Sequence, residues 1–442
     1  MASVYLRRTQ STPTDNNLYT FSCWVKRGNL GSVQALLGSF TDSSNRGQLE
    51  FTSSNQLNYY ENLSGSTSAQ VTTTQVFRDT SAWYHIVLNV DLDQATDSDR
   101  IKIYVNGTQI TSFSTATYPS QGATSVIANC TASNGLLVGG STSDYSTIYT
   151  IDGSMSHIHL IDGTAYDAST FGSTDSTTGE WTINTSPSVT YGTNGFFILK
   201  DGNSVTDQSG NSNNFTVSDG TLTNTEDSPS NVFATLNPLV KSGNSLTNGN
   251  LTVTQNSGTN YQNSVSTLAV TKGKWYAECK LSTISGLFPG VGIIDVSEKC
   301  ASDGDDNGYF GTTNNPKGVQ LFAGGYYSTG NNNNASLTSN STNDIIGIAL
   351  DLDSATKNIK MYRNGTLITG SSVTPPDPDG GYAFGVTLYS TSSGAVAEWN
   401  FGNGYFGTTA VASAGTNASG NGIFEYDCPD GYTALSTKGL NL

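Results

Sequence analysis

The sequence predicts an all-β fold of two antiparallel β-sandwiches joined by a compact irregular connector. Three observations lead to this prediction. Apolar residues alternate with polar ones in many short stretches of the 442 residues, and no stretch of useful length has the period of a helix. Gly (48 residues), Ser, Thr and Asn are abundant and supply the chemistry of turns. A strand-turn-strand pattern that ends in Asn-Gly occurs once in each half of the chain.

The repeated pattern covers residues 84–111 and 346–369. The first copy is YHIVLNVDLDQATDSDRIKIYVNGTQIT and the second is IGIALDLDSATKNIKMYRNGTLIT. Each copy has an alternating strand, a polar turn with Ala-Thr, a second strand and an Asn-Gly pair, at 106–107 or 364–365. Asn-Gly favours the positive φ values of a type I′ turn, so each copy is expected to form a three-strand meander. A meander of this size is stable only inside a larger sandwich, so the two copies predict two domains.

The composition of the intervening segments sets the expected boundaries. We expect a sandwich at 1–170, a connector at 171–228, a second sandwich at 229–408 and an irregular C-terminal strap at 409–442. The connector is rich in Ser, Thr, Asn and Gly but contains the apolar cluster 196–199, which is typical of a compact segment and not of a flexible linker.

Charge and composition argue against several classes of function. The net charge of −16 and the lack of a basic run predict no binding to nucleic acid. No apolar run approaches the roughly 18 residues of a membrane span, so membrane insertion is not expected. The cysteines are too scattered for a disulfide framework or a zinc site and predict free thiols. They are Cys23, Cys130, Cys279, Cys300 and Cys428.

Several phrases of the sequence occur in an order that resembles a known group of proteins. The first 170 residues contain YLRRTQST, TFSCWVKRGNLGS, TTTQVFRDTSAWYHIV and IKIYVNGTQITSFSTATYPSQ. They resemble the laminin-G-like, concanavalin A-like domain of structural proteins of marine bacteriophages. TDSTTGEW, YGTNGFFI and DSPSNVFATLNPL resemble the connector of the same proteins, and GKWYAECKL, IGIALDLD, MYRNG and EWNFGNGYF resemble a SPRY domain. The resemblance implies two concanavalin-like sandwiches of the jelly-roll type.

The same resemblance implies a function on a virus particle. It implies a virion surface protein, made in the host cytoplasm and placed in a tail appendage or fibre. Such a protein would adhere, without catalysis, to a host-surface glycan or to a neighbouring capsid or tail protein, and it could form a homo-oligomer. The first alternative is a capsid decoration or head-fibre protein with no host ligand.

The second alternative is a glycan-degrading enzyme, and the sequence disfavours it. Laminarinase-type enzymes on this kind of sandwich carry paired carboxylates on one strand in an E-x-D-x-x-E pattern. The nearest approach is Glu425-Tyr-Asp427-Cys-Pro-Asp430, which ends in Asp and contains a proline that a central strand would not tolerate. We therefore expect no enzymatic activity.

Two tyrosine pairs are candidates for ligand binding. They are Tyr59–Tyr60 and Tyr326–Tyr327, and both lie among Asn, Ser and Gly residues. Tyrosine rings can stack on sugar faces while neighbouring amides bind the hydroxyl groups. Packing at the edge of a sandwich is the alternative interpretation of the same residues.

One acidic segment is a candidate metal site. Asp303, Asp305 and Asn307, followed by Gly308, match the first half of a calcium loop, so Ca²⁺ is the one cofactor that the sequence suggests. Asn314 stands where that loop needs a bidentate Glu, so an ordinary acidic turn is the preferred interpretation. His157 and His159 would share one side of a regular strand and form a weak metal pair, but packing is preferred there too.

Overall fold

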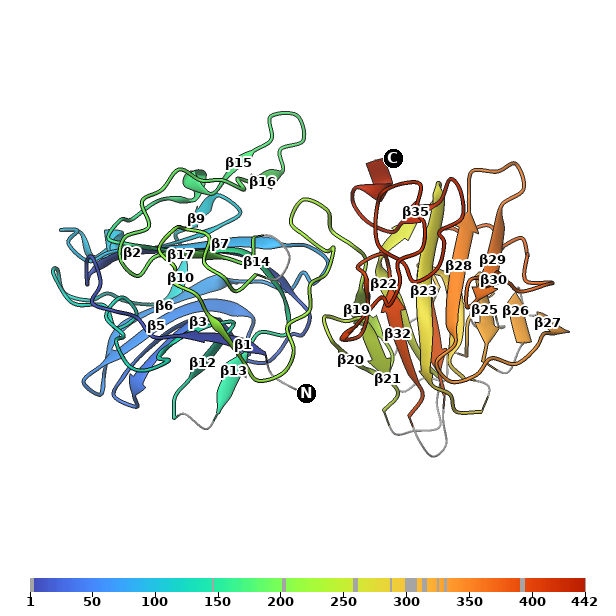
Figure 1. Ribbon diagram of the computed structural model, residues 1–442, viewed down its shortest axis with the longest axis horizontal. Helices are drawn as coiled ribbons and strands as arrows, with labels where there is room; N and C mark the ends of the chain where they lie inside the picture. Colours follow the sequence, from blue (N-terminus) through green and yellow to red (C-terminus); the bar gives the residue numbers. More distant parts are fainter. Residues whose placement is uncertain are drawn as a thin grey trace. The chain divides into compact units, whose positions relative to one another are not determined.

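The computed structural model describes ten ranges of the chain and shows two compact units (Figure 1). The described ranges are 4–144, 147–200, 204–256, 261–286, 288–298, 308–311, 316–323, 326–329, 332–389 and 394–441. Over these ranges the chain forms strands, turns and three short 3-10 helices, η1 (Asp97–Asp99), η2 (Ala168–Thr170) and η3 (Gly439–Asn441). Within the same ranges no helix has the length and apolar character that a membrane span requires. The predicted all-β fold is confirmed.

The first unit, Met1–Asn224, is a sandwich of two antiparallel sheets. We call the larger one its open sheet. In spatial order it contains β10 (Phe113–Thr117), β6 (Ser66–Val76), β5 (Gln56–Leu63), β4 (Asn45–Phe51), β3 (Gln34–Asp42), β11 (Leu136–Val138), β1 (Tyr5–Arg8) and β18 (Thr216–Ser218). The strapped sheet contains β17 (Phe196–Ile198), β14 (Gly153–Asp162), β2 (Leu18–Arg27), β7 (Tyr84–Asp91), β8 (Ile101–Val105) and β9 (Thr108–Ile110). Two small hairpins, β12 (Gly140–Thr142) with β13 (Ile148–Thr150) and β15 (Gly172–Thr174) with β16 (Trp181–Ile183), complete the unit.

The second unit, Thr225–Leu442, is also a sandwich. Its open sheet contains β19 (Leu236–Lys241), β22 (Gln262–Val270), β31 (Tyr382–Leu388), β24 (Gly290–Asp295), β25 (Gly318–Phe322), β26 (Tyr326–Thr329) and β27 (Asn332–Ser336). Its strapped sheet contains β20 (Ser245–Thr247), β21 (Thr252–Thr254), β32 (Val396–Asn400), β23 (Lys274–Thr283), β28 (Ile345–Asp351), β29 (Asn358–Arg363) and β30 (Thr366–Leu367), and β35 (Thr433–Ala434) pairs in parallel with β23. The short hairpin of β33 (Tyr405–Phe406) and β34 (Thr409–Ala410) follows.

The two units have the same strand order. The run β6-β5-β4-β3-β11-β1 of the first open sheet corresponds to β27-β26-β25-β24-β31-β22 of the second. In the strapped sheets, β14-β2-β7-β8-β9 corresponds to β32-β23-β28-β29-β30. The correspondence covers both faces of the sandwich, so it extends well beyond the repeat that the sequence shows.

The repeated segments form the predicted meanders. In β7, Ile86 and Leu88 point into the core while Val87 points to the outer face, as strand alternation requires. The two turn residues of the first copy, Asn106 and Gly107, have φ values of 47° and 79°, and those of the second copy have 48° and 78°. Positive φ at both positions is the geometry of a type I′ turn. The predicted turn type is therefore confirmed in both copies.

In each unit, the segment that follows the sandwich packs over the outer face of the strapped sheet. We call residues 166–191 the first strap and residues 411–436 the second strap. In the first unit, the Trp181 ring lies so close to the Asn-Gly turn that a Cβ atom on Gly107 would come within 2.3 Å of it. In the second unit, a Cβ atom on Gly365 would come within 2.7 Å of the Tyr426 ring. The glycine of each turn therefore serves two purposes, the positive φ and the close approach of an aromatic ring.

The cysteines that the structure describes are buried free thiols. They are Cys23, Cys130, Cys279 and Cys428, whereas Cys300 lies outside the described residues. Burial raises the pKa of the Cys428 thiol to about 12 and that of Cys130 above its ordinary value. Buried thiols with raised pKa values are poor nucleophiles and poor metal ligands.

Candidate functional site

The straps leave the outer faces of the open sheets as the broad surfaces on which a ligand could lie. In the first unit, the β12–β13 hairpin packs on the outer face of β3. A Cβ atom on Gly38 would come within 2.5 Å of the Gly140 carbonyl oxygen, which shows how close the two layers lie. The part of the sheet beyond this hairpin consists of β4, β5, β6 and the edge strand β10.

The outer surface of β4, β5 and β6 is made of polar side chains. Apolar residues of the three strands, such as Leu49, Tyr59 and Val71, point into the core, so the residues between them point outward. Cross-strand pairs then place the outward residues side by side. We call this set the polar face, and it consists of Arg46, Gln48, Glu50, Asn58, Tyr60, Asn62, Gln70 and Thr72.

Tyr60 is the aromatic residue of the polar face. Its ring is half-buried, and the guanidinium carbon of Arg46 lies 5.8 Å from the ring centroid. The Asn62 side-chain amide donates a hydrogen bond to the Tyr60 hydroxyl at 3.2 Å. Arg46 in turn donates to the carbonyl of Ser43 at 2.9 Å. The tyrosine ring is thus held between a cation and an amide, in an arrangement that fixes its orientation.

A hydrogen-bonded row crosses the face beside this tyrosine. Thr72 donates to the Asn58 Oδ1 at 2.7 Å, and the Asn58 amide donates to the Glu50 Oε1 at 3.2 Å. All three side chains are largely buried, and Glu50 is only 6% exposed. The second carboxyl oxygen of Glu50, Oε2, is buried and has no hydrogen-bond partner. Burial raises the pKa of Glu50 above its ordinary value. The row therefore braces the strands beneath the outward side chains, and it does not offer the Glu50 Oε2 to a ligand, because this oxygen is buried.

The structure separates the first of the two predicted tyrosine pairs. Tyr59 is 1% exposed, and its hydroxyl lies 3.1 Å from that of Tyr19 inside the core. Tyr59 therefore cannot stack on a ligand, and its assignment as a ligand-binding residue is wrong, because adjacent residues of a strand point to opposite faces. Tyr60 is the member of the pair that faces outward.

The other predicted site residues lie in or near the second open sheet. Tyr326 and Tyr327 begin β26, which corresponds to β5 of the first unit, and only their backbone is described. Asp303, Asp305 and Asn307 lie outside the described residues, so calcium binding there stays a prediction. Among the residues that the structure does describe, no group of three or more His, Cys, Asp or Glu side chains is arranged to hold a metal ion.

The two histidines of the weak metal pair do not lie on a regular strand. The register of β14 against β2 shifts between Ser156 and His159, and His157 has a φ of 46°. His159 is fully enclosed, and its Nδ1 lies 2.9 Å from the Tyr191 hydroxyl. His159 therefore packs under the first strap, which agrees with the preferred interpretation of this segment.

The model of the concanavalin A-like lectin/glucanases superfamily matches residues 2–146, a range that includes all of β4, β5 and β6. No curated protein matches the sequence. Among solved structures, the SPRY domain of human HERC1 is 16% identical, covers 37% of this chain and 96% of its own, and has a TM-score of 0.31. The TRIM65 PSpry domain is 11% identical (38% and 88% covered, TM-score 0.30), and a SAP-like pentraxin from Limulus polyphemus is 15% identical (37% and 72% covered, TM-score 0.28).

Proposed function

We propose that the protein is a non-catalytic adhesion module that binds carbohydrate through the polar face of its first unit. The observation that carries the proposal is the outward-facing Tyr60 ring, which the Arg46 guanidinium and the Asn62 amide hold in one orientation on a polar surface. The face lies within the part of the chain that matches the superfamily of concanavalin A-like lectins and glucanases.

The chemistry of the polar face suits a sugar. A pyranose ring has an apolar face that can lie on Tyr60, and its equatorial hydroxyls can donate and accept hydrogen bonds at the same time. Arg46 can donate to a hydroxyl, and the amides of Gln48 and Asn62 can both donate and accept. Such a shallow site binds weakly, so many copies on one particle would be needed for firm attachment.

The same face supports binding without cleavage. Glycoside hydrolysis normally uses two carboxyl groups that flank the scissile bond, about 5–10 Å apart. Glu50 is the one carboxylate of the polar face, and its closest hydrogen-bond partner is the Asn58 amide. This single buried carboxyl group lacks the second carboxyl group that hydrolysis needs.

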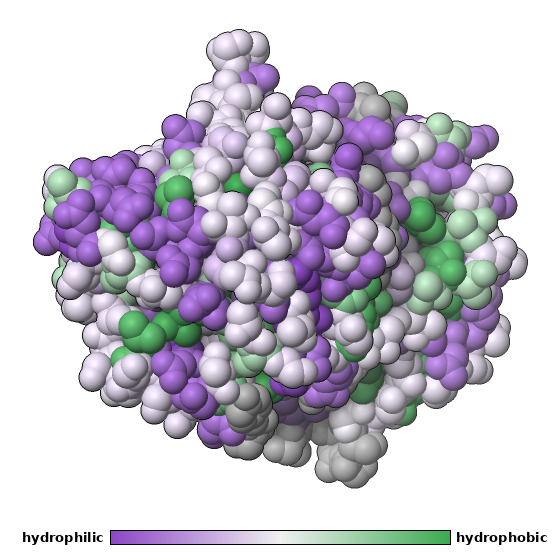
Figure 2. Space-filling model, turned by 60° about the vertical axis from the view of Figure 1, so that its left-hand side comes forward, coloured by the Kyte–Doolittle hydropathy of each residue, from purple (hydrophilic) through white to green (hydrophobic). Residues whose placement is uncertain are grey.

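We further propose that the protein acts on the surface of a bacteriophage particle, in a tail appendage or fibre. The support is the order of phrases in the sequence that resembles phage structural proteins. The surface seen in Figure 2 has hydrophobic residues only in small separate patches among polar ones, as expected for a protein that meets water and polar ligands. Labelling the protein on intact particles for electron microscopy would test its position, and an exclusive position on capsid faces would favour the decoration alternative.

We expect Arg46→Ala and Tyr60→Ala each to weaken retention on host envelope polysaccharide about tenfold, since each removes roughly 1–1.5 kcal/mol of stacking or charge-assisted hydrogen bonding. Retention of the full chain on an immobilised glycan panel measures the effect. Arg78→Ala is the matched control, because Arg78 is an exposed arginine of the same unit outside the polar face.

Two results would contradict this proposal. Equal retention of Tyr60→Ala, Arg46→Ala and the Arg78→Ala control would exclude the polar face as the binding site. Release of reducing ends from the glycan, lost on substitution of a carboxylate such as Glu50, would replace adhesion with hydrolysis.

A further inference from the structure

The open sheet of the second unit carries an aromatic cluster on its outer face. The cluster consists of Tyr261, Phe288, Tyr309, Phe322 and Tyr389. Ring centroids lie 4.9 Å apart for Tyr261 and Tyr389, 5.3 Å for Tyr261 and Tyr309, and 4.8 Å for Tyr309 and Phe322. The two phenylalanines are buried, whereas the three tyrosines are half-buried. The cluster therefore presents tyrosines at the surface and rests on phenylalanines.

A buried polar row adjoins the phenylalanine side of the cluster. The Thr387 hydroxyl lies 2.7 Å from the Asn263 Oδ1 and 3.0 Å from the Gln320 Oε1. One hydroxyl proton cannot serve both acceptors, so the Gln320 amide fits equally well with its two atoms exchanged. In either orientation one amide atom has no partner, although Gln320 is 0% exposed. The Gln320 amide packs on Gly290, because a Cβ atom on this glycine would come within 2.9 Å of the amide nitrogen. Gly290 in turn pairs with Phe322 of the aromatic cluster across β24 and β25.

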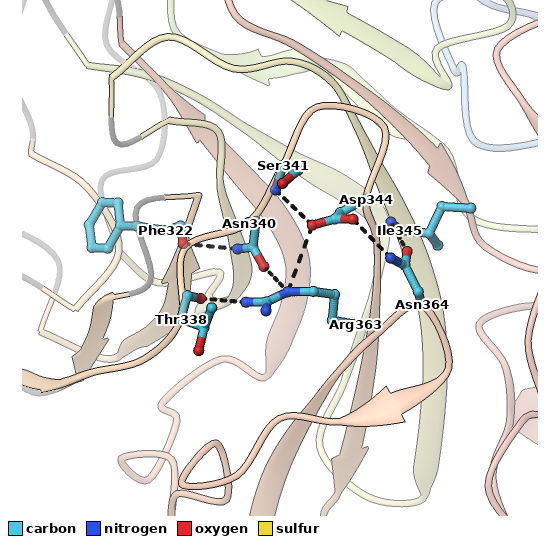
Figure 3. A network of polar contacts seen from close by, with 8 residues as sticks. All are labelled: Phe322, Thr338, Asn340, Ser341, Asp344, Ile345, Arg363 and Asn364. Atoms are coloured by element: carbon cyan, nitrogen blue, oxygen red, sulfur yellow. Dashed lines mark hydrogen bonds and ion pairs between the residues drawn. The ribbon is translucent and has the colours of Figure 1, made fainter.

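A polar network fixes the backbone at the edge of the cluster (Figure 3). The Asn340 amide donates to the Phe322 carbonyl at 3.2 Å, and Arg363 donates to the Asn340 Oδ1 at 2.6 Å. Asp344 pairs with Arg363 at 3.8 Å and accepts from the Asn364 amide at 2.8 Å. Phe322 is thereby tied to the β28–β29 meander of the opposite sheet. The ring cluster rests on a fixed backbone, which is a property of preorganised sites.

One member of the buried row, Gln320, occupies the same place in the fold as a residue of the polar face of the first unit. In the first open sheet Gln48 pairs with Gly38 across β4 and β3. In the second, Gln320 pairs with Gly292 across β25 and β24, the corresponding strands. The position that places an amide on the first face thus places an amide beneath the aromatic cluster of the second.

We propose that the aromatic cluster is a second carbohydrate site, which takes uncharged pyranose units. The inference rests on the proposed function and extends it, because the chain would then hold two sites of different chemistry. The five rings carry no charge, and the residues of the row beside them are neutral and buried, so stacking on the rings and hydrogen bonds to the tyrosine hydroxyls are the contacts that this site offers. Two weak sites on one chain can engage the same polysaccharide and strengthen each other through effective concentration.

The test is native affinity electrophoresis of the full chain in gels that contain laminarin, dextran or galactomannan. Wild-type protein should be retarded by at least one of these neutral polysaccharides. Tyr261→Ala and Tyr389→Ala should each weaken the retardation about tenfold, whereas Tyr261→Phe should keep most of it. Tyr149→Ala is the control, because Tyr149 is 37% exposed in the first unit and lies outside both sites. Near-ultraviolet circular dichroism checks that each variant is folded.

The double variant Arg46→Ala/Tyr60→Ala separates this inference from the proposed function. If this variant is still retarded and the further change Tyr389→Ala abolishes the retardation, the second site is supported. If the wild type is retarded but Tyr261→Phe, Tyr261→Ala and Tyr389→Ala all behave like Tyr149→Ala, the inference is wrong and the polar face accounts for binding. If no neutral polysaccharide retards the wild type while host glycans still bind through Arg46, the inference is also wrong and the proposed function stands.

Discussion

Glu278→Ala is expected to detach the second strap and to lower the free energy of unfolding of the second unit by about 3–5 kcal/mol at pH 5.5. Glu278 is 0% exposed and accepts hydrogen bonds from the backbone amides of Glu425 and Tyr426 at 2.8 and 2.9 Å. The Tyr276 hydroxyl and the Asn400 amide each lie 3.3 Å from the same carboxyl group. Truncation leaves these donors without an acceptor. Denaturant unfolding measures the loss, and hydrogen exchange at residues 425 and 426 locates it.

Glu278→Gln is the matched control, because it keeps the shape of the side chain and one acceptor oxygen. We expect an intermediate loss of stability and partial protection of the two amides. Wild-type stability of Glu278→Ala, with full protection of residues 425 and 426, would show that other contacts hold the second strap.

Glu278 also gives the second unit a dependence on pH. Burial raises the pKa of this carboxyl group from 4.5 to about 7, so between these values the folded state holds a proton that the unfolded state has lost. The stabilisation is then complete below pH 4.5 and is lost as the pH rises through 7. The stability of the wild type relative to Glu278→Gln should therefore fall by about 3 kcal/mol over this range, since one pKa unit corresponds to about 1.4 kcal/mol.

Much of the fold could be predicted because its signals are local. The alternation in residues 84–92 and the Asn-Gly pair at 106–107 determine strand and turn from neighbouring residues alone. The same alternation contains the information that separates Tyr59 from Tyr60. Leu57 and Tyr59 are two residues apart on one strand and both point into the core, so the residues that follow each of them, Asn58 and Tyr60, point to the outer face. Adjacent tyrosines on a strand point to opposite faces and cannot form one binding platform. The prediction of Tyr59 and Tyr60 as a pair did not take this into account.

The strap contacts could not be predicted, because they join residues that are far apart in the sequence. Glu278 binds amides 147 and 148 residues away, and nothing in its neighbourhood distinguishes it from an exposed glutamate. The aromatic cluster could not be predicted for the same reason, because Tyr261, Tyr309 and Tyr389 come from three separate segments of the chain. The residue of the first unit that corresponds to Glu278 is not a glutamate, so comparing the two halves of the sequence does not reveal this contact either. Ser22, which faces Val87 across β2 and β7, occupies the place of Glu278, which faces Gly347 across β23 and β28.

His85→Ala is expected to destabilise the first unit by about 3–5 kcal/mol, because it removes a buried ring and leaves the indole N–H of the half-buried Trp181 without its acceptor. The Trp181 indole N–H donates to the His85 Nδ1 at 3.0 Å, so this nitrogen must carry a lone pair. The proton of the neutral ring therefore sits on Nε2, which lies 2.9 Å from the Ser22 hydroxyl. His85 also stacks on Trp24 with centroids 4.8 Å apart. Loss of the ring should free the first strap, which tryptophan fluorescence during denaturant unfolding would record.

The neutral state of His85 makes the first unit sensitive to acid, in the opposite direction to Glu278. Burial lowers the pKa of His85 from 6.5 to about 3, and a proton on Nδ1 would face the indole donor. The unfolded state therefore binds more protons between these values, so the stabilisation is complete above pH 6.5 and is lost as the pH falls towards 3. Relative to His85→Gln, whose amide does not titrate, the wild type should lose about 4 kcal/mol over this range. A stability difference between the two proteins that does not change from pH 7 to pH 4 would mean that His85 takes up its proton at the same pH in the folded and unfolded states, so the first strap does not keep it neutral.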